Sequence, residues 1–261
     1  MPVPSDREGL AALLAGAGFV AAEDEAAELI DRSAGDAAVL ESLVARRLTG
    51  EPLAWIVGRV SFCGIEIRMC PGVYVPRWQS EPLARRAAER LPATGVAVDL
   101  CTGTGAIARV LSAQRPRARV VASDISDLAV SCARANGVEA YNADLFAALP
   151  DGLEGRVDVV VSVVPYVPTP ELGLLQRDTF AFESPLSYDG GGDGTDILRR
   201  VLADSARFLR PGGSVLLELG GDQADLIAGD LARHGYRDAT VLFDEDGDPR
   251  GIEATLHPRK R

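Results

Sequence analysis

From residue 81 onward, the sequence alternates short apolar runs with longer segments of helical pattern, and this alternation leaves few possible folds. Apolar runs expected to form strands lie at 96–100, 119–123, 138–141, 157–162, 214–219, 239–243 and 252–257. Helical patterns lie between most of them, at 106–114, 128–136, 196–208 and 223–234. Because strands that alternate with helices form a parallel sheet covered on both faces, we expect an α/β, doubly wound, seven-stranded Rossmann-like sheet. The last two strands are joined without a helix and should form an antiparallel hairpin.

The first 80 residues have a different pattern. Apolar residues at helical spacing between 24 and 48 predict two helices, separated by Gly35 and Asp36. Residues 65–70 then alternate in the way of a half-buried strand, and residues 56–60 could pair with them as a hairpin. The sequence therefore predicts two domains: residues 1–80, a helical domain with a hairpin, and residues 81–261, the catalytic domain. We expect the first to cover the carboxyl-end face of the sheet on the acceptor side.

Composition excludes several classes of protein. The formal net charge of −11 repels phosphate backbones, so nucleic acid is not expected as a partner. No run of 18 apolar residues is present and the first ten residues do not resemble a secretory signal, which predicts a cytoplasmic protein without a membrane partner. The four cysteines show no C-x-x-C spacing and only two histidines occur, so no metal site is expected. A monomer is favoured.

One segment, Val96–Ala106, contains in succession a strand, a glycine turn and the start of a helix. Gly103 and Gly105 allow a ligand to approach the backbone closely, and the helix N-terminus offers unpaired N–H groups. A G-x-G-x-x-A spacing in this turn fits a dinucleotide, but Asp99 would repel a pyrophosphate and suits a cofactor with an ammonium and a sulfonium. Asp124, after the next strand, is placed for two ribose hydroxyls in either case. A simple surface turn is the third possibility.

The segment Asp99–Gly105, followed by Ala122–Asp124, resembles the first two motifs of class I S-adenosylmethionine-dependent methyltransferases. That family more often has a glycine where this chain has Cys101, which implies a non-glycine backbone conformation at this position. The resemblance implies S-adenosylmethionine as cofactor and S-adenosylhomocysteine as product. It implies cofactor contacts at Asp99, Cys101, Thr102, Gly103, Thr104, Gly105, Asp124, Ile125, Asp144, Leu145 and Val163.

Segments along nearly the whole chain resemble the HemK/PrmC glutamine methyltransferases, which modify peptide-chain release factors. These segments are Gly50–Gly58, Pro71–Arg77, Val163–Pro168, Glu183–Pro185 and Gly212–Gly220 with Gln223. The resemblance implies in-line methyl transfer to a nitrogen atom without a metal or a covalent intermediate. Because parallel sheets place ligands at the carboxyl ends of their strands, the transfer site is expected at Val163, Val164, Pro165 and Tyr166.

The chain departs from that family at this motif, because the family's Asn-Pro-Pro-Tyr is Val163-Val164-Pro165-Tyr166 here. In the family, the asparagine oxygen and a backbone carbonyl are thought to accept the two N–H bonds of the glutamine amide, which positions a poor nucleophile. Valine has no acceptor, and an unpaired buried N–H costs about 1–3 kcal/mol. The family's Arg-Pro-Glu-Thr-Glu is also altered, to Arg77-Trp78-Gln79-Ser80-Glu81.

Three explanations follow from this departure. The favoured one is a changed acceptor, a guanidine or amine nitrogen of a free amino acid (arginine-like) or another metabolite, which would need a carboxylate partner. The second is a protein glutamine of the release-factor type, with another residue in place of the asparagine. The third is a catalytically inactive homologue that only binds the cofactor.

The acceptor is expected to contact side chains from distant parts of the sequence. Glu81, Glu183 and Asp189 or Asp193 are candidate carboxylates for a cationic acceptor, and Trp78 could stack on a guanidinium. Two of these residues also have structural interpretations: Trp78 could pack between the domains, and Glu183 could hold the loop 168–193. The predicted substrate-binding residues are Arg77, Trp78, Glu81, Tyr166 and Glu183, and the last two are also expected at the catalytic site.

Overall fold

The computed structural model describes residues 3–175 and 182–257. These residues fall into two compact units, one within Met1–Arg59 and Gln176–Phe182, the other within Val60–Leu175 and Glu183–Arg261. Each unit is described separately. No helix among the described residues has the length and apolar content that crossing a membrane requires.

The smaller unit is a group of helices with its own core. It contains α1 (Arg7–Gly16), α2 (Ala22–Ser33), α3 (Ala37–Leu48) and α4 (Leu53–Val57). Asp36 caps α3 by accepting hydrogen bonds from two backbone N–H groups, which explains why the helical pattern breaks there. The core is made of buried apolar side chains from all four helices, chiefly Leu10, Leu14, Ala26, Leu29, Leu40, Val44 and Ile56.

The expected hairpin is shorter than the sequence suggests. Residues 56 and 57 belong to α4, and the two strands are β1 (Arg59–Phe62) and β2 (Ile65–Arg68). Pro52 precedes α4, and the side chain of Ile56 packs into the helical core instead of pairing in a sheet. Phe62 and Ile67 are buried in the core of the larger unit. The compact division therefore falls at residue 59, whereas the sequence led us to expect a boundary at residue 80.

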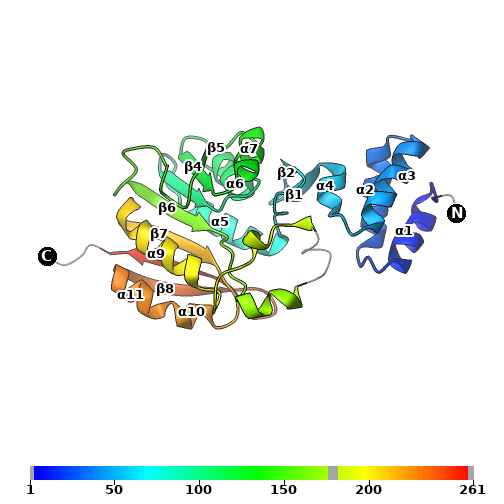
Figure 1. The fold of residues 1–261 in the computed structure, drawn as a ribbon. Helices are drawn as coiled ribbons and strands as arrows, with labels where there is room; N and C mark the ends of the chain where they lie inside the picture. The colour runs from blue at the N-terminus through cyan, green and yellow to red at the C-terminus, as the bar shows by residue number, and fades with distance from the viewer. Residues whose placement is uncertain (1–2, 176–181, 258–261) are drawn as a thin grey trace. The chain divides into compact units, whose positions relative to one another are not determined.

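The larger unit is built on a seven-stranded sheet with the strand order β5-β4-β3-β6-β7-β9-β8 (Figure 1). The first five strands in this order are parallel, and β9 is antiparallel to both of its neighbours. The strands are β3 (Val96–Leu100), β4 (Arg119–Asp124), β5 (Glu139–Asn142), β6 (Val157–Ser162), β7 (Leu209–Glu218), β8 (Tyr236–Phe243) and β9 (Pro249–Leu256). The predicted fold class and the antiparallel hairpin are confirmed.

Successive strand residues point to opposite sides of the sheet, and apolar residues occur on both sides. Helices therefore cover both faces. One face packs on α5 (Glu81–Arg90), α6 (Ala106–Gln114) and α7 (Asp127–Ala135). The other packs on α9 (Asp196–Phe208) and α11 (Ala228–His234). The helical segment expected at 223–234 is divided into α10 (Gln223–Leu226) and α11. Short 3₁₀ turns, η1 (Trp78–Ser80), η2 (Thr169–Leu174) and η3 (Pro185–Ser187), complete the described elements.

Candidate functional site

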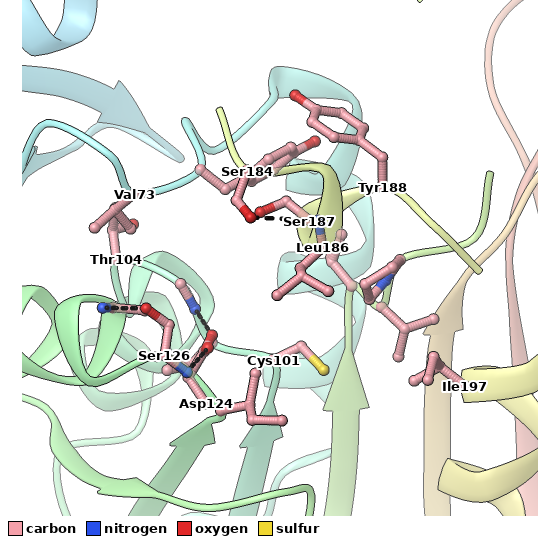
Figure 2. A pocket seen from close by; sticks show the side chains of 18 of the residues that line it. Val73, Cys101, Thr104, Asp124, Ser126, Ser184, Leu186, Ser187, Tyr188 and Ile197 are labelled. Atoms are coloured by element: carbon pink, nitrogen blue, oxygen red, sulfur yellow. Dashed lines mark hydrogen bonds between the residues drawn. The ribbon is translucent and has the colours of Figure 1, made fainter. Parts of the chain in front are cut away.

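A cavity of about 470 Å³ lies at the carboxyl ends of β3, β4 and β6. The strand order reverses between β3 and β6, which is where ligands bind in doubly wound sheets. In Figure 2, Cys101 and Asp124 lie on one side of this cavity and the segment Ser184–Tyr188 lies on the opposite side. Its size is within the usual range for small-molecule and cofactor sites.

The glycine turn after β3 forms part of the wall. Gly105 has a φ of +81°, and a Cβ there would lie 2.8 Å from Val138 Cγ2 and 3.1 Å from Ala133 Cβ. Gly103 also has a positive φ, +56°, but a Cβ there would meet no atom within 4 Å. Both glycines thus allow left-handed backbone, but only Gly105 is required for packing. Gly103 lines the cavity, whereas Gly105 does not.

Cys101 adopts the conformation that a glycine would favour, with a φ of +54°. The expectation of a non-glycine backbone conformation is therefore wrong. The turn keeps the shape that glycine would give it, and the left-handed backbone at Cys101 costs about 1–2 kcal/mol. Burial raises the pKa of the Cys101 thiol to about 12, so a thiolate does not form near neutral pH.

Asp99 is almost completely buried, and it lines the cavity. Its Oδ2 accepts hydrogen bonds from the Thr102 hydroxyl at 2.6 Å and from the Ala108 N–H at 3.1 Å. Burial raises the pKa of Asp99 to about 7 despite these two bonds. A buried carboxyl with such a pKa favours a cationic ligand that would stabilise its charged form.

Asp124 is held at the end of β4 by two backbone N–H groups. The N–H of Gly103 donates to one carboxylate oxygen and the N–H of Ser126 to the other, each at 2.9 Å (Figure 2). Each oxygen keeps further lone pairs, so the carboxylate can accept two hydroxyl groups. Ile125, Asp144 and Leu145 line the cavity on this side, and Asp144 pairs with Arg200 at 2.7 Å.

The segment after β6 lines the other part of the cavity. Val163, Val164, Pro165 and Tyr166, the expected transfer site, all contribute to the wall. The Tyr166 carbonyl accepts a 2.6 Å hydrogen bond from Gln223 Nε2, and its phenol donates to Glu218 Oε1 at 3.1 Å. Burial raises the pKa of Tyr166 far above neutral, so the phenol keeps its proton.

Glu183 is buried but does not line the cavity. Its carboxylate accepts the Val75 N–H at 2.8 Å and the Arg77 guanidinium at 2.6 Å, and it also binds the Tyr188 hydroxyl. Burial of the site opposes the charge of Arg77, but the Glu183 carboxylate holds the pKa of Arg77 above its usual value. These bonds join the segment 73–77 to the segment 183–188, and both segments line the cavity through other residues.

Two further residues predicted to bind the acceptor also lie outside the cavity wall. Trp78 is 72% exposed, so it is not packed as a core residue. Glu81 accepts the Cys63 N–H at 2.8 Å and pairs with Arg85. Of the predicted substrate-binding set, only Tyr166 lines the cavity.

Several residues were not predicted from the sequence. Tyr74, Ser80, Ser184 and Tyr188 line the cavity, and Glu218 lies behind Tyr166. A signal for Glu218 was present, because it ends a strand of the sheet as Asp124 does. The others lie in irregular segments, where spacing carries no information about direction.

Comparisons with known proteins agree with this geometry. Residues 97–179 match the family model of a methyltransferase domain. A release factor glutamine methyltransferase of Geobacter sulfurreducens is 35% identical over 221 residues, which cover 82% of this chain and 77% of that protein. The enzyme of that name from Mycobacterium leprae is 38% identical over 251 residues, covering 92% and 83%. A methyltransferase structure from Pyrococcus furiosus shares the fold, with a TM-score of 0.53, 19% identity and coverage of 82% and 98%.

The cavity residues fit S-adenosylmethionine, the cofactor of class I methyltransferases. Asp99 supplies a buried anion for a cation, Asp124 supplies fixed acceptors for ribose hydroxyls, and Gly103 leaves open space beside the turn. Of the two cofactors that the sequence allowed, we therefore assign S-adenosylmethionine to this site and not a dinucleotide. The chain is an S-adenosylmethionine-dependent methyltransferase, and it belongs to the family of release factor glutamine methyltransferases.

Proposed function

We propose that this enzyme methylates the side-chain amide nitrogen of a glutamine in a protein of the release-factor type. This acceptor is the second of the three that the departure at Val163 allows. The first, a small arginine-like molecule, has no support among the relatives, which are named for glutamine in release factors. The acceptor in this proposal is a neutral amide instead of a cation.

One structural observation carries the proposal: the cavity wall near Val163 is made mainly of apolar and hydroxyl-bearing residues. Among the described residues, the wall near Val163 includes Tyr74, Ser80, Val164, Pro165, Tyr166, Ser184, Leu186, Ser187, Tyr188 and one carboxylate, Asp189. A guanidinium acceptor would need a carboxylate, but Glu81 and Glu183 do not line the cavity. Asp189 lines it and is held within its own loop, because its Oδ1 accepts the Thr169 hydroxyl at 2.6 Å and the Gly191 N–H at 3.1 Å.

The roles of the other residues follow from their positions. Asp99 and the turn residues Cys101–Thr104 would hold the methionine part of the cofactor, and Asp124 would hold its ribose. Gly105, expected as a cofactor contact, does not line the cavity and would only shape the turn. Ile125, Asp144 and Leu145 would border the adenine. When bound, S-adenosylmethionine supplies an electrophilic methyl group, and the products are S-adenosylhomocysteine, the methylated amide and one proton.

Arg77 and Glu183 are given a structural role in this proposal. Because both carboxylate oxygens of Glu183 are engaged, the pair would fix the segments that shape the acceptor side. Trp78 and Glu81 receive no role in the chemistry. The cytoplasmic location, the monomeric state and the position of the helical domain over the acceptor stay predictions.

A labelled-methyl assay tests the proposal directly. The purified enzyme is incubated with labelled cofactor and a release factor, with the same release factor carrying Gln→Ala at its modified position, and with free arginine. Transfer to the first acceptor alone is expected. Transfer to free arginine but not to the release factor would overturn the proposal, and no transfer to any acceptor alongside measurable cofactor binding would favour the inactive homologue.

A further inference from the structure

The substitution of asparagine by Val163 leaves the acceptor amide one hydrogen-bond acceptor short. An amide nitrogen carries two N–H bonds, and a backbone carbonyl of the motif can satisfy one of them. Val163 lines the cavity with an apolar side chain that can accept nothing. If a glutamine amide is the substrate, as proposed above, a second acceptor has to come from another residue of the wall.

Tyr166 has an oxygen that is prepared to accept. A phenol has one hydrogen, and that of Tyr166 is donated to Glu218 Oε1 at 3.1 Å. With its only hydrogen engaged there, the phenolic oxygen can form additional hydrogen bonds only as an acceptor. Tyr166 lines the cavity three residues after Val163, at the same end of β6.

Glu218 lies behind Tyr166 and fixes the direction of its hydrogen. It is 4% exposed and does not line the cavity, and the Ser80 hydroxyl also lies beside its carboxyl. Within residues 3–175 and 182–257, Glu218 Oε2 has no hydrogen-bond partner. An ionised carboxylate has no hydrogen to donate, so Oε1 accepts the Tyr166 hydrogen when Glu218 is charged.

The backbone around Tyr166 is tightly constrained. Gln223 Nε2 donates to its carbonyl at 2.6 Å. A Cβ at Gly194 would lie 2.3 Å from the same carbonyl oxygen, and one at Gly190 would lie 2.8 Å from Tyr166 Cα. The glycines of this loop thus permit close packing against the Tyr166 backbone, and the hydrogen bond to Glu218 orients the phenol.

We propose that the phenolic oxygen of Tyr166 accepts one N–H of the acceptor amide in place of the missing asparagine oxygen, and that Glu218 is its positioning residue. The inference rests on the proposed function. It assigns an acceptor role to Tyr166 and a structural reason for the buried acid at the end of β7.

A double-mutant cycle tests the role of Tyr166. Methyl transfer to the release factor is measured for the wild type, Tyr166→Phe, Val163→Asn and the double variant, and cofactor affinity is measured by calorimetry. Tyr166→Phe should lower kcat about tenfold to a hundredfold with cofactor affinity unchanged, because one N–H of the bound amide loses its partner. In the Val163→Asn background the same change should cost less than about threefold, since the asparagine supplies the acceptor.

The outcomes separate the two proposals. An equal loss from Tyr166→Phe in both backgrounds, or no loss in either, would overturn the inference while the wild-type activity still supports the proposed function. A wild type that transfers no methyl group to the release-factor glutamine would overturn the proposed function and this inference together.

Variants of Glu218 test the positioning role. Glu218→Gln keeps an acceptor oxygen for Tyr166, so kcat should stay within about threefold of the wild type. Glu218→Leu removes it and should lower kcat as far as Tyr166→Phe does, with no further loss when the two are combined. Glu218→Gln as inactive as Glu218→Leu, or losses that multiply in the double variant, would show that Glu218 does not act through Tyr166.

Discussion

The two glycines of the turn after β3 should respond differently to the same added methyl group. At Gly105, alanine must adopt a φ of +81° and must place its Cβ 2.8 Å from Val138 Cγ2 and 3.1 Å from Ala133 Cβ. The left-handed backbone costs about 1–2 kcal/mol and the overpacking about 1–3 kcal/mol. A smaller entropy of the unfolded chain offsets about 0.4–1 kcal/mol, so Gly105→Ala should lower the free energy of unfolding by about 1–4.5 kcal/mol.

Gly103→Ala is the matched control. Its φ of +56° carries the same backbone strain, but its Cβ would meet no protein atom within 4 Å. A smaller entropy of the unfolded chain offsets about 0.4–1 kcal/mol of that strain, so the net loss of stability should stay near 1 kcal/mol. Because Gly103 lines the cavity, this variant should instead lose affinity for S-adenosylmethionine.

The assay is urea unfolding without cofactor, followed by calorimetric titration of S-adenosylmethionine. We expect Gly105→Ala mainly to lose stability. We expect Gly103→Ala mainly to lose affinity for S-adenosylmethionine. Equal losses of stability in the two variants would refute the argument that Val138 and Ala133 determine the need for Gly105.

Three more predictions follow from the site. The pKa of Asp99 is about 7, so its carboxylate is neutralised as the pH falls below 7, and affinity for the cationic cofactor should be about tenfold weaker at pH 6 than at its plateau above pH 8. Asp99→Asn should bind the cofactor weakly and without this pH dependence. Calorimetry at several pH values measures both profiles, and a flat profile for the wild type would contradict the reasoning. Glu183→Gln should lower the free energy of unfolding by about 1–3 kcal/mol and raise KM for the release factor, because its buried partners lose a charged acceptor. The control Glu139→Gln, which breaks the exposed ion pair with Arg119, should change the free energy of unfolding by less than about 1 kcal/mol. Because burial raises the pKa of Cys101 to about 12, its alkylation by iodoacetamide at pH 8 should be far slower than that of free cysteine, as peptide mass spectrometry can measure.

Sequence patterns predicted the parts of this protein that depend on periodicity and on strand ends. The parallel sheet, the helices 106–114 and 196–208, and the positions of Asp99, Asp124 and Val163–Tyr166 at one edge all follow from alternating apolar runs and from the rule that strand ends meet. A glycine-like φ at Cys101 could not be predicted, because side-chain identity argues against it and only the shape of the turn requires it.

Contacts between distant segments were also beyond the sequence. Glu183 was expected at the acceptor, but its oxygens are engaged by Val75, Arg77 and Tyr188, more than a hundred residues away in the first two cases. Which way a carboxylate turns depends on the segments that pack around it, and no local spacing records those neighbours. The same holds for Glu218 and Tyr166, which are adjacent only because β6 and β7 pair.

The place of β9 in the sheet has a consequence for biosynthesis. β9 comes last among the described strands, yet it lies between β7 and β8 and contributes the buried Ile252 and Ala254. While the ribosome is still adding residues 249–256, the hydrogen-bonding edge of β7 next to Glu218 has no neighbour, and β8 has no strand to pair with. The sheet behind Tyr166 can therefore be completed only after β9 has been translated. Until then the nascent enzyme exposes an unpaired strand edge that is prone to aggregation and that a chaperone could shield.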